Sequence, residues 1–86
     1  MKIINQKKFI NGNLRLQPRI QKKVDAVVKK FHENPFHPSL KNHPLKGKQN
    51  DKRSISVTGD MRIIFREYNN YVIVLMLDVG THNQVY

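Results

Sequence analysis

The chain has 86 residues and no cysteine, and its sixteen Lys and Arg residues outnumber six Asp and Glu residues, which gives a formal net charge of +10. This length suits one compact core, so we expect a single domain over residues 1–86. The lack of cysteine excludes disulfides and thiolate metal sites. So large a positive charge favours a polyanionic partner, nucleic acid first and an acidic protein second. A basic surface that only keeps the protein soluble is the simpler alternative.

Neither a targeting segment nor a membrane span is predicted. Residues 1–16 have no continuous apolar stretch, and the longest apolar run, Tyr71–Leu77, is too short to cross a bilayer. Binding to a membrane surface is disfavoured, because the main basic helix has no Trp and turns its apolar face to a core. We therefore expect a soluble, cytoplasmic protein without a membrane partner.

The first half of the chain is mainly helical in prediction. Lys2–Asn5 is expected to form a short strand, followed by a weakly indicated helix around Lys8–Leu16. The clearest helix runs from about Pro18 to Glu33, since apolar residues recur there at helical spacing and lysines occupy the other side. Proline suits the first helical position, and Asn34-Pro35 ends the helix.

The second half predicts a sheet, after an irregular and proline-rich connector at residues 34–50. Connectors of this length are often functional. Three strands are expected, at Lys52–Thr58, Met61–Tyr68 and Tyr71–Asp78. The last strand is nearly all apolar, as is usual in the centre of a sheet.

The expected turn lengths determine the register of these strands. A two-residue turn at Asn69-Asn70 pairs Phe65 with Val74, and a three-residue turn at Gly59 pairs Ile55 with Phe65. The apolar side chains then share the face that the helix covers. The opposite face is expected to be polar and cationic, and we expect function there; it carries Ser54, Ser56, Thr58, Arg62, Ile64 and Arg66. The predicted fold class is α+β, with a twisted antiparallel sheet of three to four strands packed on N-terminal helices.

Groups suited to RNA cleavage are concentrated in the last third of the sequence. Attack by the 2′-hydroxyl of RNA requires a base, an acid for the departing 5′-oxygen, and a cation at the phosphate. Histidine serves as base or acid near neutral pH, because the ordinary pKa of its side chain is about 6.5. Arginine matches phosphate oxygens with its planar guanidinium. The first candidates are therefore Arg62, His82 and Tyr86.

Three segments resemble the RelE/YafQ-like toxins of bacterial toxin–antitoxin pairs. They are His43-Pro44-Leu45-Lys46-Gly47, Gly59-Asp60-Met61-Arg62-Ile63-Ile64-Phe65 and Val79-Gly80-Thr81-His82-Asn83-Gln84-Val85-Tyr86. The resemblance covers most of the chain, and the combination of D-x-R-I-I-F with G-T-H-x-x-x-Tyr is specific. It implies a RelE/ParE-like fold and a ribosome-dependent mRNA interferase. Such an enzyme cleaves mRNA in the ribosomal A site by attack of the 2′-hydroxyl, and leaves a 2′,3′-cyclic phosphate.

The same resemblance implies the residues of the site. By motif, catalytic roles go to His43, Asp60, His82 and Tyr86, and Arg62 contacts the scissile phosphate. Five further cations are expected to contact RNA phosphates: Lys46, Lys48, Lys52, Arg53 and Arg66. The chain departs from the family pattern at two positions. Ser56 stands where YafQ-like proteins often have His, and Met61 stands where Trp or Tyr is usual, so cleavage must depend on fewer groups or be weaker.

No metal or other cofactor is expected, because the four histidines lack a ligand spacing such as H-x-x-x-H and carboxylates are few. The expected partners are the ribosome, its mRNA and a cognate acidic antitoxin. The toxin alone is expected to be a monomer that forms a hetero-oligomer with the antitoxin. Two other functions stay open: a ParE-like topoisomerase inhibitor, which shares the fold, and a non-catalytic RNA-binding module, which needs the charge but not the histidines.

Overall fold

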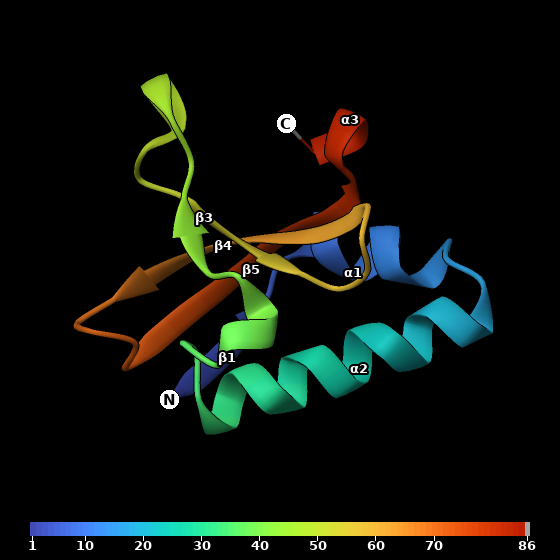
Figure 1. The fold of residues 1–86 in the computed structure, drawn as a ribbon, viewed down its shortest axis with the longest axis horizontal. Coiled ribbons are helices and arrows are strands. Elements are labelled where there is room, and N and C mark those ends of the chain that lie inside the picture. Colours follow the sequence, from blue (N-terminus) through green and yellow to red (C-terminus); the bar gives the residue numbers. More distant parts are fainter. Residues whose placement is uncertain (86) are drawn as a thin grey trace.

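Within residues 1–85, five strands form one mixed sheet in the order β1-β5-β4-β3-β2, and α2 lies along one of its faces (Figure 1). The computed structural model describes these 85 residues, and Tyr86 lies outside them. The elements are β1 Lys2–Asn5, α1 Lys7–Leu14, α2 Pro18–Glu33, the 3₁₀ helix η1 Pro38–Leu40, β2 His43–Pro44, the 3₁₀ helix η2 Gly47–Gln49, β3 Arg53–Ser56, β4 Met61–Tyr68, β5 Ile73–Thr81 and α3 His82–Val85.

The helix α2 has the predicted bounds, and its apolar stripe lies in the core. Val24 and Phe31 are buried, and the Phe31 ring meets Phe65 edge to face with ring centroids 4.9 Å apart. Such a pair adds about 0.5–1.5 kcal/mol to the burial of the two side chains. Phe9 of α1 joins the same core cluster. No helix within residues 1–85 is long and apolar enough to cross a membrane.

The register between β4 and β5 differs from the prediction, because their connection is longer than a two-residue turn. Residues 69–72 join the strands, and the first three of them have positive φ angles of 55°, 59° and 69°. Phe65 therefore lies opposite Met76 and not opposite Val74. From Phe65 to Tyr68 the shift is two residues, which preserves the alternation of side chains. Between Ile64 and Phe65 the register shifts once more, so Ile63 lies opposite the buried Val79, and the predicted core face is correct.

The connection between β3 and β4 is also longer than predicted. Residues 57–60 form it, and the first two N–H groups of this loop both donate to Met61 O, at 2.9 and 3.4 Å. As a result, Ile55 lies opposite Ile63 and not opposite Phe65. Both side chains of this pair are fully buried. This register also places Ser56 opposite Arg62.

The sheet of the described residues has five strands, where three to four antiparallel strands were predicted, and the two edge strands are β1 and β2. β1 pairs with β5 in parallel, since the chain passes through α1 and α2 and the rest of the sheet before it returns as β5. β2 lies in the predicted irregular connector and pairs antiparallel with β3. A strand of only two residues gives no periodic pattern, so the sequence does not predict it. The predicted α+β class with one sheet packed on N-terminal helices is confirmed.

The face of the sheet away from α2 is less open than predicted. Ser54 and Ile64, both expected on an accessible polar face, are 0% and 3% exposed. The segment that contains η2 and the helix α3 both rise from this side of the sheet (Figure 1), and α3 contacts β4 and β5. These additions bury the middle of the face and leave a groove between them. We call this side of the sheet the open face, although its centre is covered.

Candidate active site

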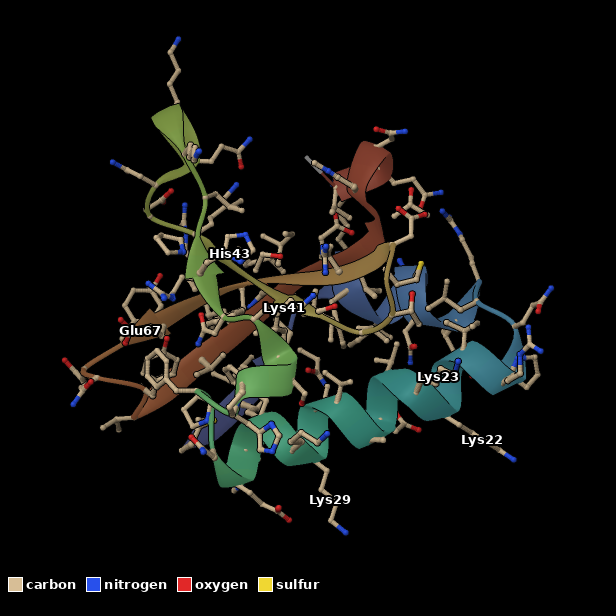
Figure 2. All side chains as sticks on the ribbon, in the orientation of Figure 1. Lys22, Lys23, Lys29, Lys41, His43 and Glu67 are labelled. Carbon is tan, nitrogen blue, oxygen red and sulfur yellow. The ribbon has the colours of Figure 1, made fainter. Side chains whose placement is uncertain are left out.

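His43 is held in one orientation by the backbone beside it. Lys41 has a left-handed conformation with a φ of 52°, and its carbonyl oxygen lies 2.7 Å from His43 Nδ1. Because a carbonyl oxygen can only accept, Nδ1 carries the hydrogen, and the lone pair of the neutral ring is on Nε2. His43 lies on the opposite side of the sheet from α2 (Figure 2). Its exposed ring can therefore offer Nε2 to a substrate.

Asn42, directly before this histidine, is anchored by three hydrogen bonds. Its Nδ2 donates to Pro35 O and to the Tyr71 hydroxyl, each at 3.0 Å. Its Oδ1 accepts from Arg53 Nε at 2.8 Å. We call Asn42, Tyr71 and Arg53 the anchoring network. It fixes the backbone that carries His43 and ties that backbone to the loop between β4 and β5.

His82 begins α3, and Gly80 allows this helix to fold back over β5. A Cβ atom on Gly80 would lie 2.8 Å from Gln84 Oε1 and 3.1 Å from Val85 Cγ1. The same Gln84 oxygen accepts the Thr81 N–H at 2.8 Å, which ties the first turn of α3 to the end of the strand. The glycine of the G-T-H segment thus has a packing role, because it brings α3 and His82 close to the sheet.

The two histidines line one groove. His43 and the residues after it come from the connector and η2, whereas His82 comes from α3. The groove has a volume of about 480 Å³ and is lined by His43, Pro44, Leu45, Lys46, Gln49 and His82. The structure therefore brings together two histidines that belong to separate motifs. A groove with two imidazoles and an ammonium suits a reaction that needs a base, an acid and an anion site. We call it the histidine groove.

Arg62 lies on the same face of the sheet as His43. Its neighbours are Ser56 on β3 and Gly80 on β5, and His43 pairs with Ser54, two residues before Ser56. Since side chains alternate along a strand, Ser54 and Ser56 project from one face, and so do His43 and Arg62. The half-buried Arg62 does not line the histidine groove. It pairs with Ser56, two residues along β3 from Ser54, the partner of His43.

Asp60 is not brought into this group. Asp60 is exposed in the turn between β3 and β4, where its backbone N–H donates to Thr58 Oγ1 at 3.4 Å. This position gives it a turn role, and its part in catalysis stays a prediction. Tyr86 lies outside the described residues, so the prediction about its ring also stays untested.

Four of the five cations expected to contact RNA lie around the histidines: Lys46, Lys48, Lys52 and Arg66. Lys46 lines the histidine groove, and Lys48 is exposed in η2. Lys52 and Arg66 line the next hollow along the open face. Arg53 differs, because it lies on the alternate face of β3 and its Nε bonds to Asn42. Arg53 thus stabilises the position of Asn42, the residue before His43, from the other face of the sheet.

The sequence does not predict the roles of Asn42 and Tyr71. The sequence shows that Asn42 directly precedes His43, but it does not show which residues Asn42 contacts. Its bond to the Tyr71 hydroxyl joins residues that are 29 positions apart. That contact depends on the left-handed backbone of Tyr71, with a φ of 69°. A Tyr in this conformation is uncommon, and no sequence pattern signals it.

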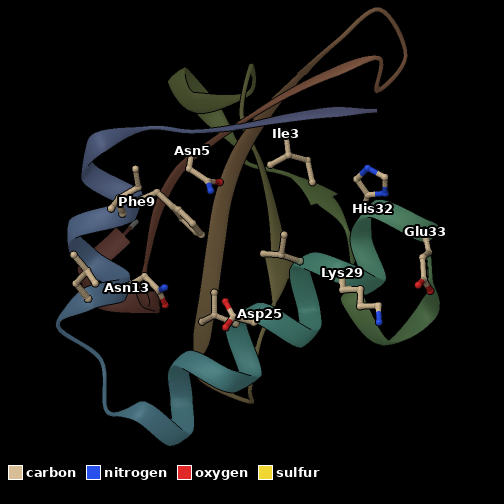
Figure 3. Close-up of a pocket in the computed structure, with 12 residues that line it drawn as sticks. Ile3, Asn5, Phe9, Asn13, Asp25, Lys29, His32 and Glu33 are labelled. Carbon is tan, nitrogen blue, oxygen red and sulfur yellow. The ribbon is translucent and has the colours of Figure 1, made fainter.

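Within residues 1–85, no group of three or more His, Asp or Glu side chains is placed to hold a metal ion. A separate hollow of about 620 Å³ lies between β1, α1 and α2 (Figure 3) and is lined mainly by apolar side chains. It contains none of the predicted site residues. Four polar residues of α2 line it and offer controls for substitutions in the histidine groove: Asp25, Lys29, His32 and Glu33.

Comparison with solved structures supports this fold. YafQ from E. coli strain BL21(DE3) matches with a TM-score of 0.82 and 19% identity, over 99% of this chain and 97% of that chain. The E. coli DinJ–YafQ toxin–antitoxin complex gives a TM-score of 0.80 at 19% identity, over 99% of this chain and 96% of that chain. The YoeB/ParE toxin from Agrobacterium tumefaciens gives 0.78 at 20% identity, over 95% and 99%. No curated protein sequence matches the chain.

The fold is therefore that of the small toxins of bacterial toxin–antitoxin systems. A family model described as "Bacterial toxin of type II toxin-antitoxin system, YafQ" matches residues 3–86. The chain belongs to this YafQ toxin family.

Proposed function

We propose that this chain is a metal-independent endoribonuclease that cleaves mRNA in the ribosomal A site and thereby inhibits translation. The observation that carries the proposal is the histidine groove, in which His43 and His82 line one hollow beside Lys46. Membership of the YafQ toxin family supports the toxin role. The net charge of +10 supports a substrate made of RNA.

The proposed reaction is an in-line transfer within one RNA strand. A histidine takes the proton of the 2′-hydroxyl, and the 2′-oxygen forms a bond to the adjacent phosphorus. The bond from phosphorus to the 5′-oxygen breaks, and the second histidine gives its proton to that oxygen. Arg62 stabilises the extra charge on the phosphate oxygens. The products are a 2′,3′-cyclic phosphate and a 5′-hydroxyl, so no external oxidant or cofactor is needed.

We assign the base to His43 and the acid to His82. The hydrogen bond from His43 Nδ1 to Lys41 O leaves the lone pair of the neutral ring on Nε2, which is the form that a base requires. The same bond keeps the ring from rotating, and this lowers the entropy lost when substrate binds. The acid role then goes to His82, which lines the same groove from α3. Asp60 and Tyr86 remain proposed contributors on the family motif.

The proposed partners follow from family and charge. YafQ of E. coli has been solved in complex with DinJ, its antitoxin. We propose that this chain likewise forms a hetero-oligomer with an acidic antitoxin and is a monomer without it, because acidic side chains would complement the basic surface. A toxin that acts on translating ribosomes works in the cytoplasm.

The test compares wild type, His82→Ala and His32→Ala on translating ribosomes that carry a defined message. His32 is exposed on α2 and lines the hollow between β1, α1 and α2, so it is a matched control. Wild type and His32→Ala should cut the message and leave 2′,3′-cyclic ends, whereas His82→Ala should be slower by about 10²–10⁴-fold. Intact message with wild type would reject the enzyme, and inhibition of gyrase supercoiling by the same sample would favour the ParE-like alternative.

A further inference from the structure

The histidine groove adjoins a second hollow on the open face, and that hollow adjoins a third one beside α1. Gln49 lines both the histidine groove and a hollow of about 360 Å³ over β4 and β5. That hollow shares Lys8, Asp78 and Val85 with a third one, of about 650 Å³, between α1 and α3. The three hollows therefore form one continuous track from η2 to α1. We call it the basic track, after its cations Lys46, Lys52, Arg66, Lys8, Lys7 and Arg15.

Two cations of this track are paired with carboxylates. Arg66 forms an ion pair with Asp51, and Lys8 Nζ lies 3.2 Å from Asp78 Oδ2. The side chain of Lys8 is 77% exposed, whereas that of Asp78 is 15% exposed. The largely buried Asp78 thus keeps the exposed ammonium of Lys8 beside the track. A phosphate that arrives at Lys8 or Arg66 competes with a carboxylate, whereas among the described residues no ion pair holds Lys7, Arg15 or Lys46.

The lysines at the start of α1 are unfavourable for the helix itself. Lys7 and Lys8 form its first turn, which contains no acidic residue, and Gln6 makes no side-chain capping bond. Positive side chains at this end oppose the helix dipole, so they destabilise the helix. Lys7 and Arg15, together with Asn11 between them, recur every four residues and line the same hollow. Within this stripe, Lys7 opposes the helix dipole and Arg15, at the C-cap, does not; the unfavourable cations at the start of α1 suit a bound anion.

The floor of the middle hollow favours single-stranded over duplex RNA. The half-buried Leu77 and Val85 line it between the cations, above the buried side chain of Ile64. Leu77 is the extra residue of a β-bulge, since Ile64 pairs with Asp78 and the next residue of β4 pairs with Met76. Apolar side chains between cations suit a strand whose bases are unstacked and can lie on the protein, whereas a duplex presents mainly phosphates and hydroxyls.

We infer that a single strand of RNA runs from the histidine groove along the basic track, with Lys7, Lys8 and Arg15 as phosphate contacts beyond the cleavage site. This inference rests on the proposed endoribonuclease function, because it assigns the path of the substrate on one side of the scissile phosphate. It adds α1 to the RNA-binding surface. The α1 cations then contribute to affinity and not to the chemical step.

The first experiment measures binding of an RNA that cannot be cleaved, because its 2′-hydroxyls are methylated. The variant Lys7→Gln/Lys8→Gln/Arg15→Gln is compared with Lys22→Gln/Lys23→Gln/Lys29→Gln, which removes the same charge from the exposed side of α2 (Figure 2). The α1 variant should bind roughly tenfold more weakly, with a salt slope shallower by about 0.7 for each phosphate that it no longer neutralises. The α2 variant should bind as wild type does. Equal weakening in both variants, or tighter binding of duplex than of single strand, would overturn the inference.

The second experiment removes a negative charge from the track, where the first removes positive charges. Asp78→Asn keeps the Oδ1 atom that accepts the Val79 N–H at 2.9 Å and frees Lys8 for phosphate. Its control, Asp25→Asn, makes the same change in net charge in the hollow on the helix side (Figure 3). Asp78→Asn should bind the methylated RNA several-fold more tightly, and Asp25→Asn should not. The same affinity in both would overturn the role of Lys8. Neither experiment depends on cleavage, so an inactive wild type would reject the enzyme and leave the track to be judged by binding.

Discussion

The two faces of the sheet differ in what their side chains do. On the helix-covered face, Ile55, Ile63, Phe65, Val74 and Met76 are all fully buried. On the open face, Arg62 and Arg66 are half-buried, and the histidines at its edge are exposed. One face therefore stabilises the fold by burying apolar surface, and the other holds charged groups that a stable core would exclude. We expect substitutions on the two faces to change different measured quantities.

The largest effect on stability is expected from Phe31→Ala. Phe31 is fully buried against Phe65, so its truncation should lower the free energy of unfolding by about 3–5 kcal/mol. Urea denaturation measures this directly. The control is Phe36→Ala, because Phe36 is 57% exposed and should cost much less. Equal destabilisation by both substitutions would contradict the placement of the core between α2 and the sheet.

Arg62→Ala should separate chemistry from stability. Loss of a group that stabilises charge in the transition state typically slows a reaction by about 10²–10³-fold. Folding stability should change by only about 0.5 kcal/mol, and the affinity for methylated RNA by much less than the rate. Arg19→Ala, at an exposed position of α2, is the matched control. If Arg62→Ala weakens binding and cleavage equally, the transition-state role is wrong.

A smaller effect is expected from Tyr71→Phe, which links the two faces. Its hydroxyl accepts a hydrogen bond from Asn42, so its removal should cost about 0.5–1.5 kcal/mol of stability. Because Asn42 precedes His43, cleavage should also fall several-fold, and the nitrogen NMR signals of His43 should show a less defined tautomer. Tyr68→Phe, with Tyr68 43% exposed, should leave both unchanged. A structural role alone would lower stability without any change at the His43 ring.

The periodicity of the sequence was sufficient to predict which residues lie on the helix-covered face. It was insufficient to predict the loops and the burial of residues on the open face. The spacing of apolar residues predicts α2 from Pro18 to Glu33 and the alternation of the strands, because burial imposes a strict period on both. Turn lengths are not constrained in this way. In the loop of residues 69–72, Tyr71 donates its backbone N–H to Glu67 Oε1 at 2.9 Å, a side-chain interaction that composition does not reveal.

The part of the site that lies in sequence motifs was predictable. The H-P-L-K-G and G-T-H segments identify His43 and His82, which the fold brings to one groove. Arg53 looks like another RNA-contacting cation in sequence, because only the bond to Asn42 reveals its other role. Similarly, Ser54 on β3 and Ile64 on β4 are buried although they lie on the face away from α2, which the alternation of the strands does not predict. Tertiary contacts decide these cases, and local patterns do not.

A double-mutant cycle between His43 and His82 tests the central claim most directly. Single-turnover cleavage would be measured on ribosomes for His43→Ala, His82→Ala and the double variant, with folding checked for each. Residues that act on one chemical step are strongly non-additive, so the double variant should be about as slow as the slower single variant. If the two rate reductions multiply instead, the histidines act independently, and the account of one groove with a base and an acid is contradicted.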